Sequence, residues 1–86
     1  MEINQEIRNR IRLSVAAYAY EYMDDPIMSD TDFDKLALKI NPNEKTGNRK
    51  LDNFFKEHFM PDTGMWIHKH PEKEKLKYIY KEYYKK

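Results

Sequence analysis

Apolar residues recur at steps of three and four along the start of the chain, and this spacing constrains the fold more than any other feature. The stripe contains Ile3, Ile7, Ile11, Val15, Tyr18 and Tyr22. Such a period places the side chains on one face of an α-helix. Three alanines between residues 16 and 19 favour helix and leave room for close packing. Pro26 disfavours the helical conformation at Asp25, so we expect the helix to end near Asp24.

Three more helices are expected, each with its own start or stop signal. Ser29 can cap the second, with Asp32 at the capping-box position, and its apolar stripe is Phe33, Leu36, Ala37 and Ile40. The third carries Leu51, Phe54, Phe55, His58 and Phe59. The last begins at Pro71 and carries Leu76, Ile79, Tyr80 and Tyr83. The sequence therefore predicts an all-α fold, a compact bundle of about four short helices.

The sequence predicts that these elements form one domain over residues 1–86, because it contains no repeat and no linker. Residues 1–40 form a helical hairpin at the N-terminus. Residues 48–86 supply two further helices, joined by a turn that contains Pro61, Gly64 and Trp66. The segment 65–68 is either extended or one turn of helix.

Composition limits the cellular compartment and the classes of partner that we expect for the protein. An 86-residue chain without cysteine has a small core and no disulfide, which fits a reducing compartment. No apolar run approaches the roughly 20 residues of a membrane-spanning helix, and the opening residues do not resemble a signal peptide. We therefore expect a cytoplasmic protein without a membrane partner. The net charge of +1 gives no global electrostatic reason for nucleic-acid binding.

Charge is nevertheless unevenly distributed along the chain. Residues 1–34 hold three arginines against eight acids, a balance of −5, whereas residues 69–86 hold seven lysines against three glutamates, a balance of +4. Solvated helix faces are the simplest explanation. The lysine-rich end could also meet the acidic end or an acidic partner.

Residues 18–36 carry a family resemblance, with tyrosine and aspartate at fixed, ungapped spacing. The matching positions are Tyr20, Asp24, Pro26, Asp30, Asp34 and Leu36. This pattern resembles the N-terminal helical subdomain of bacterial NAD-dependent DNA ligases, over about the first 40 residues only. In that family the subdomain closes over the nicotinamide mononucleotide half of NAD. The small size, the lack of cysteine and the partial resemblance are also typical of accessory proteins of bacteriophages or prophages.

The resemblance implies a ligand site made of Tyr20, Glu21, Asp30, Phe33 and Asp34. Carboxylates can accept hydrogen bonds from ribose hydroxyls or an amide, and aromatic rings can stack on a base. Glu21 stands where the family has histidine or tyrosine, and Phe33 keeps the ring of the family's tyrosine without its hydroxyl. Either the pocket still binds NAD or nicotinamide mononucleotide, or these residues only cap and pack the hairpin.

The chain is not expected to be an enzyme. The ligase nucleophile is a lysine followed by any residue, aspartate and glycine, and the nearest match is Lys50-Leu51-Asp52-Asn53, which lacks the glycine. Asp52 is better explained as a residue at the start of a helix. A chain of 86 residues is also too short for the nucleotide-binding fold that would position AMP, metal and lysine together.

The connector around Trp66 offers two further interpretations. Met65, Trp66 and Ile67 either plug the core, which we favour in so small a protein, or form an exposed anchor for a partner. His68 and His70, with His58 or Asp62, could approach a metal ion, but no cysteine or glutamate completes a recognised spacing. We therefore predict no metal site.

Tyrosines and lysines alternate in the last helix. Tyr78, Tyr80, Tyr83 and Tyr84 lie among Lys75, Lys77, Lys81, Lys85 and Lys86. Rings beside cations can bind single-stranded nucleic acid, although two of the four tyrosines should belong to the core. The favoured prediction is a non-catalytic interaction protein that binds a host protein, as a monomer or homodimer. Its predicted interaction residues are Met65, Trp66, His68, Lys77, Lys81 and Tyr84.

Overall fold

The computed structural model describes residues 5–84, and every regular element in that range is helical. The elements are α1 (Gln5–Met23), α2 (Asp30–Lys39), α3 (Arg49–His58), the short 3-10 helix η1 (Met65–Lys69) and α4 (Lys73–Tyr83). No strand occurs between residues 5 and 84. The predicted all-α bundle is therefore confirmed, and residues 65–68 adopt the helical alternative.

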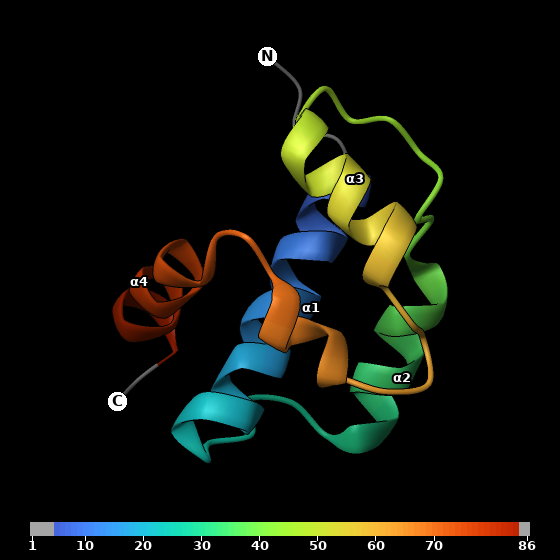
Figure 1. Ribbon diagram of the computed structural model, residues 1–86. Helices are drawn as coiled ribbons and strands as arrows, with labels where there is room; N and C mark the ends of the chain where they lie inside the picture. The colour runs from blue at the N-terminus through green and yellow to red at the C-terminus, as the bar shows by residue number, and fades with distance from the viewer. Residues whose placement is uncertain (1–4, 85–86) are drawn as a thin grey trace.

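Helix α1 lies at the centre of the molecule, with α4 on one side and α2 on the other (Figure 1). η1 crosses its front in this view, and α3 lies above α2. Because neighbours surround its middle, α1 is buried continuously from Leu13 to Ala19. The small alanines in this stretch let the surrounding helices approach closely, as the sequence indicated.

The predicted apolar stripe of α1 is only partly correct. Val15 and Tyr18 are buried, but Ile11 and Tyr22 are exposed, and Ile3 lies outside the described residues. Polar residues occupy part of the buried face instead, among them Glu6 and Arg10. The apolar period alone therefore does not predict which residues are buried near the two ends of this helix.

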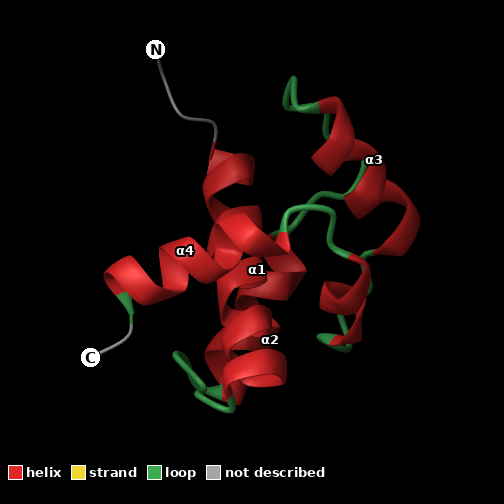
Figure 2. Cartoon of the chain, turned by 60° about the vertical axis from the view of Figure 1, so that its left-hand side comes forward, coloured by secondary structure: helices red, strands yellow, loops and turns green. Residues whose placement is uncertain are grey.

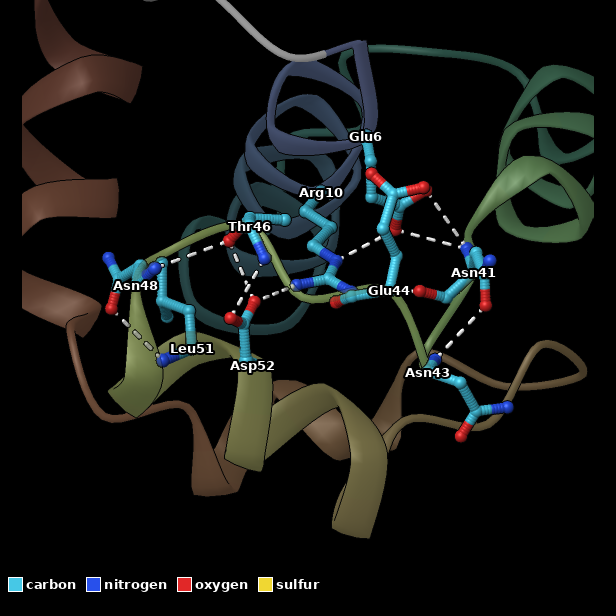
Figure 3. A network of polar contacts seen from close by, with 9 residues as sticks. All are labelled: Glu6, Arg10, Asn41, Asn43, Glu44, Thr46, Asn48, Leu51 and Asp52. Atoms are coloured by element: carbon cyan, nitrogen blue, oxygen red, sulfur yellow. Dashed lines mark hydrogen bonds and ion pairs between the residues drawn. The ribbon is translucent and has the colours of Figure 1, made fainter.

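Buried Arg10 joins α1 to the loop after α2 and to α3 (Figure 3). Its guanidinium donates to Glu6 at 2.7 Å, to Asp52 at 2.8 Å, and to the carbonyl oxygens of Asn41 and Glu44 at 2.8 and 3.0 Å. Asn41 N also donates to the Glu6 carboxylate at 3.0 Å. A buried cation needs this many partners, and the resulting network fixes the course of residues 41–48.

Asp52 lies in the first turn of α3, as expected, and it also belongs to this network. Asn48 is the N-cap of α3 and accepts from Leu51 N at 3.2 Å. Burial alone would raise the pKa of Asp52, but hydrogen bonds from Thr46 and Arg10 hold it below its usual value.

The C-terminal half contributes an aromatic core against α1. Phe54, Phe55, Phe59 and Trp66 contact one another, with ring centroids 5.3 to 6.1 Å apart. Trp66 is 4% exposed and Ile67 is fully buried, so the favoured core-plug alternative is confirmed for these two residues, whereas Met65 is exposed. This burial removes Trp66 from the predicted interaction surface.

Helix α4 packs on α1 through Leu76 and Tyr80 and stands apart from α2 (Figure 2). It begins at Lys73, two residues after the predicted start at Pro71. The Tyr80 hydroxyl donates to Asp25 at 2.5 Å, which ties α4 to the loop after α1. Tyr83, predicted as core, is instead 77% exposed. Within residues 5–84, no helix is long and apolar enough to cross a membrane.

Candidate functional site

The chain between α1 and α2 is held in a defined shape by three local features. Asp24 adopts a left-handed backbone with φ 51°, and Asp25 N closes back on the Ala19 carbonyl oxygen at 3.0 Å. Ser29 then caps α2 by accepting from Asp32 N at 3.1 Å, as predicted. Together these features bring the last turn of α1 opposite the first turn of α2.

A pocket of about 320 Å³ lies between these turns. Its lining consists of Ala16, Ala17, Tyr20, Glu21, Pro26, Ile27, Met28, Asp30, Phe33, Asp34, Thr63 and Gly64. All five residues that the resemblance singled out are therefore in one lining. We call this cavity the acidic pocket, after its carboxylates Glu21, Asp30 and Asp34.

The acidic pocket combines aromatic and apolar walls with carboxylates at its rim. Tyr20, Asp30 and Asp34 are exposed, whereas Phe33 and Glu21 are half-buried. None of the described residues in its lining is lysine, arginine or histidine. The pocket therefore presents negative potential beside two rings, an arrangement that attracts an aromatic cation.

The turn after α3 supplies a third wall that sequence reasoning did not place here. Thr63 and Gly64 line the pocket across from α2. A Cβ added at Gly64 would stand 3.5 Å from the Phe33 ring and 3.9 Å from Ala17, which are ordinary contacts. The strong turn signal at residues 61–64 was recognised, but nothing local indicated which helices the turn would contact.

His68 contacts Glu21 and Tyr22, two residues near the C-terminal end of α1. Its Nε2 lies 3.3 Å from Glu21 Oε2, and its Nδ1 lies 2.9 Å from the Tyr22 hydroxyl. Tyr22 in turn stacks on Tyr18, with centroids 4.8 Å apart. His68, predicted as an interaction residue, thus holds Glu21 at the pocket wall.

The remaining predicted interaction residues lie elsewhere on the surface. Met65 is 57% exposed at the start of η1, and Lys77, Lys81 and Tyr84 lie along α4 and at its C-terminal end. They do not share a cavity with the five pocket residues. Of the four C-terminal tyrosines only Tyr80 is buried, where two had been expected.

The histidines weighed as metal ligands are separated by their contacts. His70 is buried against Phe54, with centroids 5.0 Å apart, whereas His68 faces α1. Burial lowers the pKa of His70 from 6.5 to about 4; Glu72 opposes this effect and Lys73 adds to it. Within the described part of the chain, no three His, Cys, Asp or Glu residues are grouped to hold a metal ion.

Comparison with known proteins identifies no relative: no family model, no curated protein and no solved structure matches the chain. The ligase-cap resemblance of residues 18–36 therefore stays a prediction, and the functional interpretation depends on the residues of the acidic pocket itself.

Proposed function

We propose that the protein is a non-catalytic, cytoplasmic binding protein whose acidic pocket holds the nicotinamide–ribose half of NAD or nicotinamide mononucleotide. One observation carries the proposal: Tyr20, Glu21, Asp30, Phe33 and Asp34 line a single cavity. Its volume of about 320 Å³ lies at the lower end of the range for small-molecule sites. The rings of Tyr20 and Phe33 would contact the base, and the aspartates would accept from the ribose hydroxyls.

Charge favours the cationic part of such a ligand over its phosphate. The ring nitrogen of a ribosylated nicotinamide is positively charged, which suits three carboxylates beside two aromatic rings. A phosphate gains nothing from this lining, which contains carboxylates but no basic residue among the described positions. The phosphate would therefore point outward, and nicotinamide riboside should bind at least as tightly as the mononucleotide.

Calorimetric titration with three related compounds tests the proposal. Nicotinamide riboside and nicotinamide mononucleotide should bind, whereas dihydronicotinamide riboside, which has nearly the same shape but no ring charge, should bind about tenfold more weakly. Failure of both charged compounds to bind the folded protein at millimolar concentration would refute the function.

Three variants on α2 provide a matched comparison. Asp30→Asn and Asp34→Asn each remove one charge from the exposed rim of the pocket and should each weaken nicotinamide riboside binding by about two- to fivefold. Asp32→Asn removes the same charge from the same helix at a position outside the lining and should leave binding unchanged. Gly64→Ala should narrow the pocket without disturbing the fold, because the added methyl makes only ordinary contacts.

Binding of a host protein is the second candidate, favoured by the exposed end of α4. Tyr78 and Tyr83 are 62% and 77% exposed beside Lys77 and Lys81. A host protein retained by the wild type and by Asp34→Asn, but lost with Tyr83→Ala, would assign partner binding to this face. Oligonucleotide binding that falls steeply with salt would assign the face to single-stranded nucleic acid instead.

A further inference from the structure

Glu21, Tyr22 and His68 form a chain of hydrogen-bonded side chains near the C-terminal end of α1. The Tyr22 hydroxyl lies 2.9 Å from Nδ1 of His68, and Nε2 of the same ring lies 3.3 Å from Oε2 of Glu21. A nucleophile within hydrogen-bond reach of a base, with the base oriented by a third group, is the arrangement that activates side chains for covalent chemistry. Of these three residues, only Glu21 lines the acidic pocket.

The neighbours of His68 determine which of its ring nitrogens carries the proton. A carboxylate can only accept a hydrogen bond, so the Nε2 that faces Glu21 is protonated in the neutral ring. Nδ1 then has a free lone pair, and the Tyr22 hydroxyl donates to it. His68 is therefore placed to take the proton of this hydroxyl, and Glu21 faces the positive charge that the ring would then carry.

Helix packing holds the hydroxyl and the imidazole together. The Tyr22 ring, on α1, stacks on the buried ring of Tyr18, with centroids 4.8 Å apart. His68 belongs to η1, which the fully buried Ile67 anchors in the core. Lys73 Nζ also donates to the His68 carbonyl oxygen at 2.6 Å. The contact is thus made between two packed helices, which fix its geometry better than a loop would.

Tyr22 is the only tyrosine among residues 5–84 that combines an accessible side chain with a basic partner. It is 42% exposed. Tyr80 also has a partner, but it is 4% exposed and donates to the Asp25 carboxylate. Tyr78 and Tyr83 are 62% and 77% exposed, and neither hydroxyl has a hydrogen-bond partner within the described part of the chain.

From this geometry we propose that Tyr22 is a modification site that accepts an acyl group from activated esters, with His68 as the general base and Glu21 as a positioning residue. The hydroxyl oxygen of Tyr22 attacks the ester carbonyl carbon while its proton moves to Nδ1 of His68. The bond between the carbonyl carbon and the leaving oxygen then breaks, and the proton leaves with the alcohol or phenol. The product is an O-acyl tyrosine.

This site is independent of the nicotinamide proposal, because neither Tyr22 nor His68 lines the acidic pocket. Failure of nicotinamide riboside to bind would leave the acylation of Tyr22 unaffected, and the two proposals are tested by different measurements. Modification of one side chain is also compatible with a non-catalytic protein, since each molecule reacts once.

The probe is p-nitrophenyl acetate, added to the full-length protein near neutral pH, with peptide mapping by mass spectrometry. Tyr83 is the internal reference, because it is more exposed but has no base beside it. General bases contribute about 10²–10⁴-fold in closed enzyme sites, so at this exposed site acetyl transfer to Tyr22 should be at least about tenfold faster than to Tyr83. Because the comparison is made within the wild type, it does not depend on the folding of any variant.

Variants then identify the role of each partner, with circular dichroism as the check on folding. His68→Gln cannot accept a proton near neutral pH and should reduce acetylation of Tyr22 to about the rate at Tyr83. His58→Gln changes a histidine that contacts no tyrosine hydroxyl and should leave the rate unchanged. Glu21→Ala should slow acetylation of Tyr22, whereas Glu21→Gln keeps an acceptor for Nε2 and should restore most of the rate.

Equal acetylation rates at Tyr22 and Tyr83 in the wild type would overturn the proposal. An unchanged rate at Tyr22 in folded His68→Gln would do the same, because the base would then have no part in the reaction. A wild-type rate in Glu21→Ala would remove Glu21 from the site.

Discussion

Protonation of His70 should destabilise the protein well above the pH at which its carboxylates titrate. In the folded state burial holds the pKa of His70 at about 4, against 6.5 without that environment. Above pH 6.5 the ring is neutral in both the folded and the unfolded chain, so its contribution to stability is fully present. Between pH 6.5 and 4 the unfolded chain binds a proton that the folded chain does not, and stability falls as the pH falls.

The size of this loss follows from the two pKa values. A difference of about 2.5 in pKa corresponds to about 3 kcal/mol at and below pH 4, and to about 2 kcal/mol at pH 5. A loss of 2 kcal/mol is a large share of the total for a domain of this size, since native domains are stable by only about 5–15 kcal/mol. The effect should therefore be visible in ordinary denaturation curves.

Urea denaturation at several pH values between 7.5 and 4.5 measures it directly, with fluorescence of the buried Trp66 as the signal. His70→Asn keeps a hydrogen-bond acceptor but cannot titrate, so its free energy of unfolding should fall about 2 kcal/mol less than that of the wild type by pH 5. Parallel curves for wild type and His70→Asn, or an NMR pKa near 6.5 for His70, would refute the reasoning.

Three further substitutions test other parts of the fold. Tyr80→Phe deletes the hydrogen bond to Asp25 and should cost about 1.5–3 kcal/mol in urea denaturation. That hydrogen bond and burial raise the pKa of Tyr80 in the folded protein above its usual value of 10.0. As the pH rises above 10 and through this raised pKa, the wild type should lose the stability that the hydrogen bond contributes, whereas Tyr80→Phe should not. Asp24→Gly should increase the free energy of unfolding by about 0.5–1 kcal/mol, and so raise the melting temperature, because glycine adopts φ 51° without strain. A lower melting temperature would contradict this account of the turn. Arg10→Met leaves two carboxylates without their cation and should cost about 3–5 kcal/mol or prevent folding, as circular dichroism would show.

The helices of this protein could be predicted where their signals are local. Ser29 caps α2, and Pro26 ends α1, because capping and steric exclusion depend on a few neighbouring residues. The buried polar face of α1 could not be predicted in this way. Arg10 is stabilised inside the protein by Asp52 and by loop carbonyls more than 30 positions away, and no local period reveals such partners.

The acidic pocket also has one part that the local sequence predicts and another that depends on residues distant in the sequence. The five pocket residues that the resemblance singled out all lie within positions 20–34, on two helices joined by a short turn, so a pattern in the sequence could identify them together. Thr63 and Gly64 close the pocket from a turn about 30 residues later, and their place depends on how the aromatic core orients α3 and η1. A second cavity, of about 220 Å³ between α1, α3 and α4, was not predicted, because no sequence pattern indicates how far apart these three helices lie.

Glu21 illustrates how the two kinds of information combine. The ligase resemblance predicts a histidine or tyrosine at this position, whereas the glutamate places a negative charge in the pocket. In the structure Nε2 of His68, a residue of η1, lies 3.3 Å from Oε2 of Glu21. An imidazole therefore contacts the wall of the pocket, although it comes from a different helix. His68 contacts Glu21 from outside the cavity, because it does not line it. Glu21→Gln keeps the size of this wall residue and removes one charge, so it tests whether charge or geometry selects the ligand. If charge selects, the variant should favour nicotinamide riboside over nicotinamide mononucleotide less strongly than the wild type does, and equal ratios in the two proteins would argue for geometry.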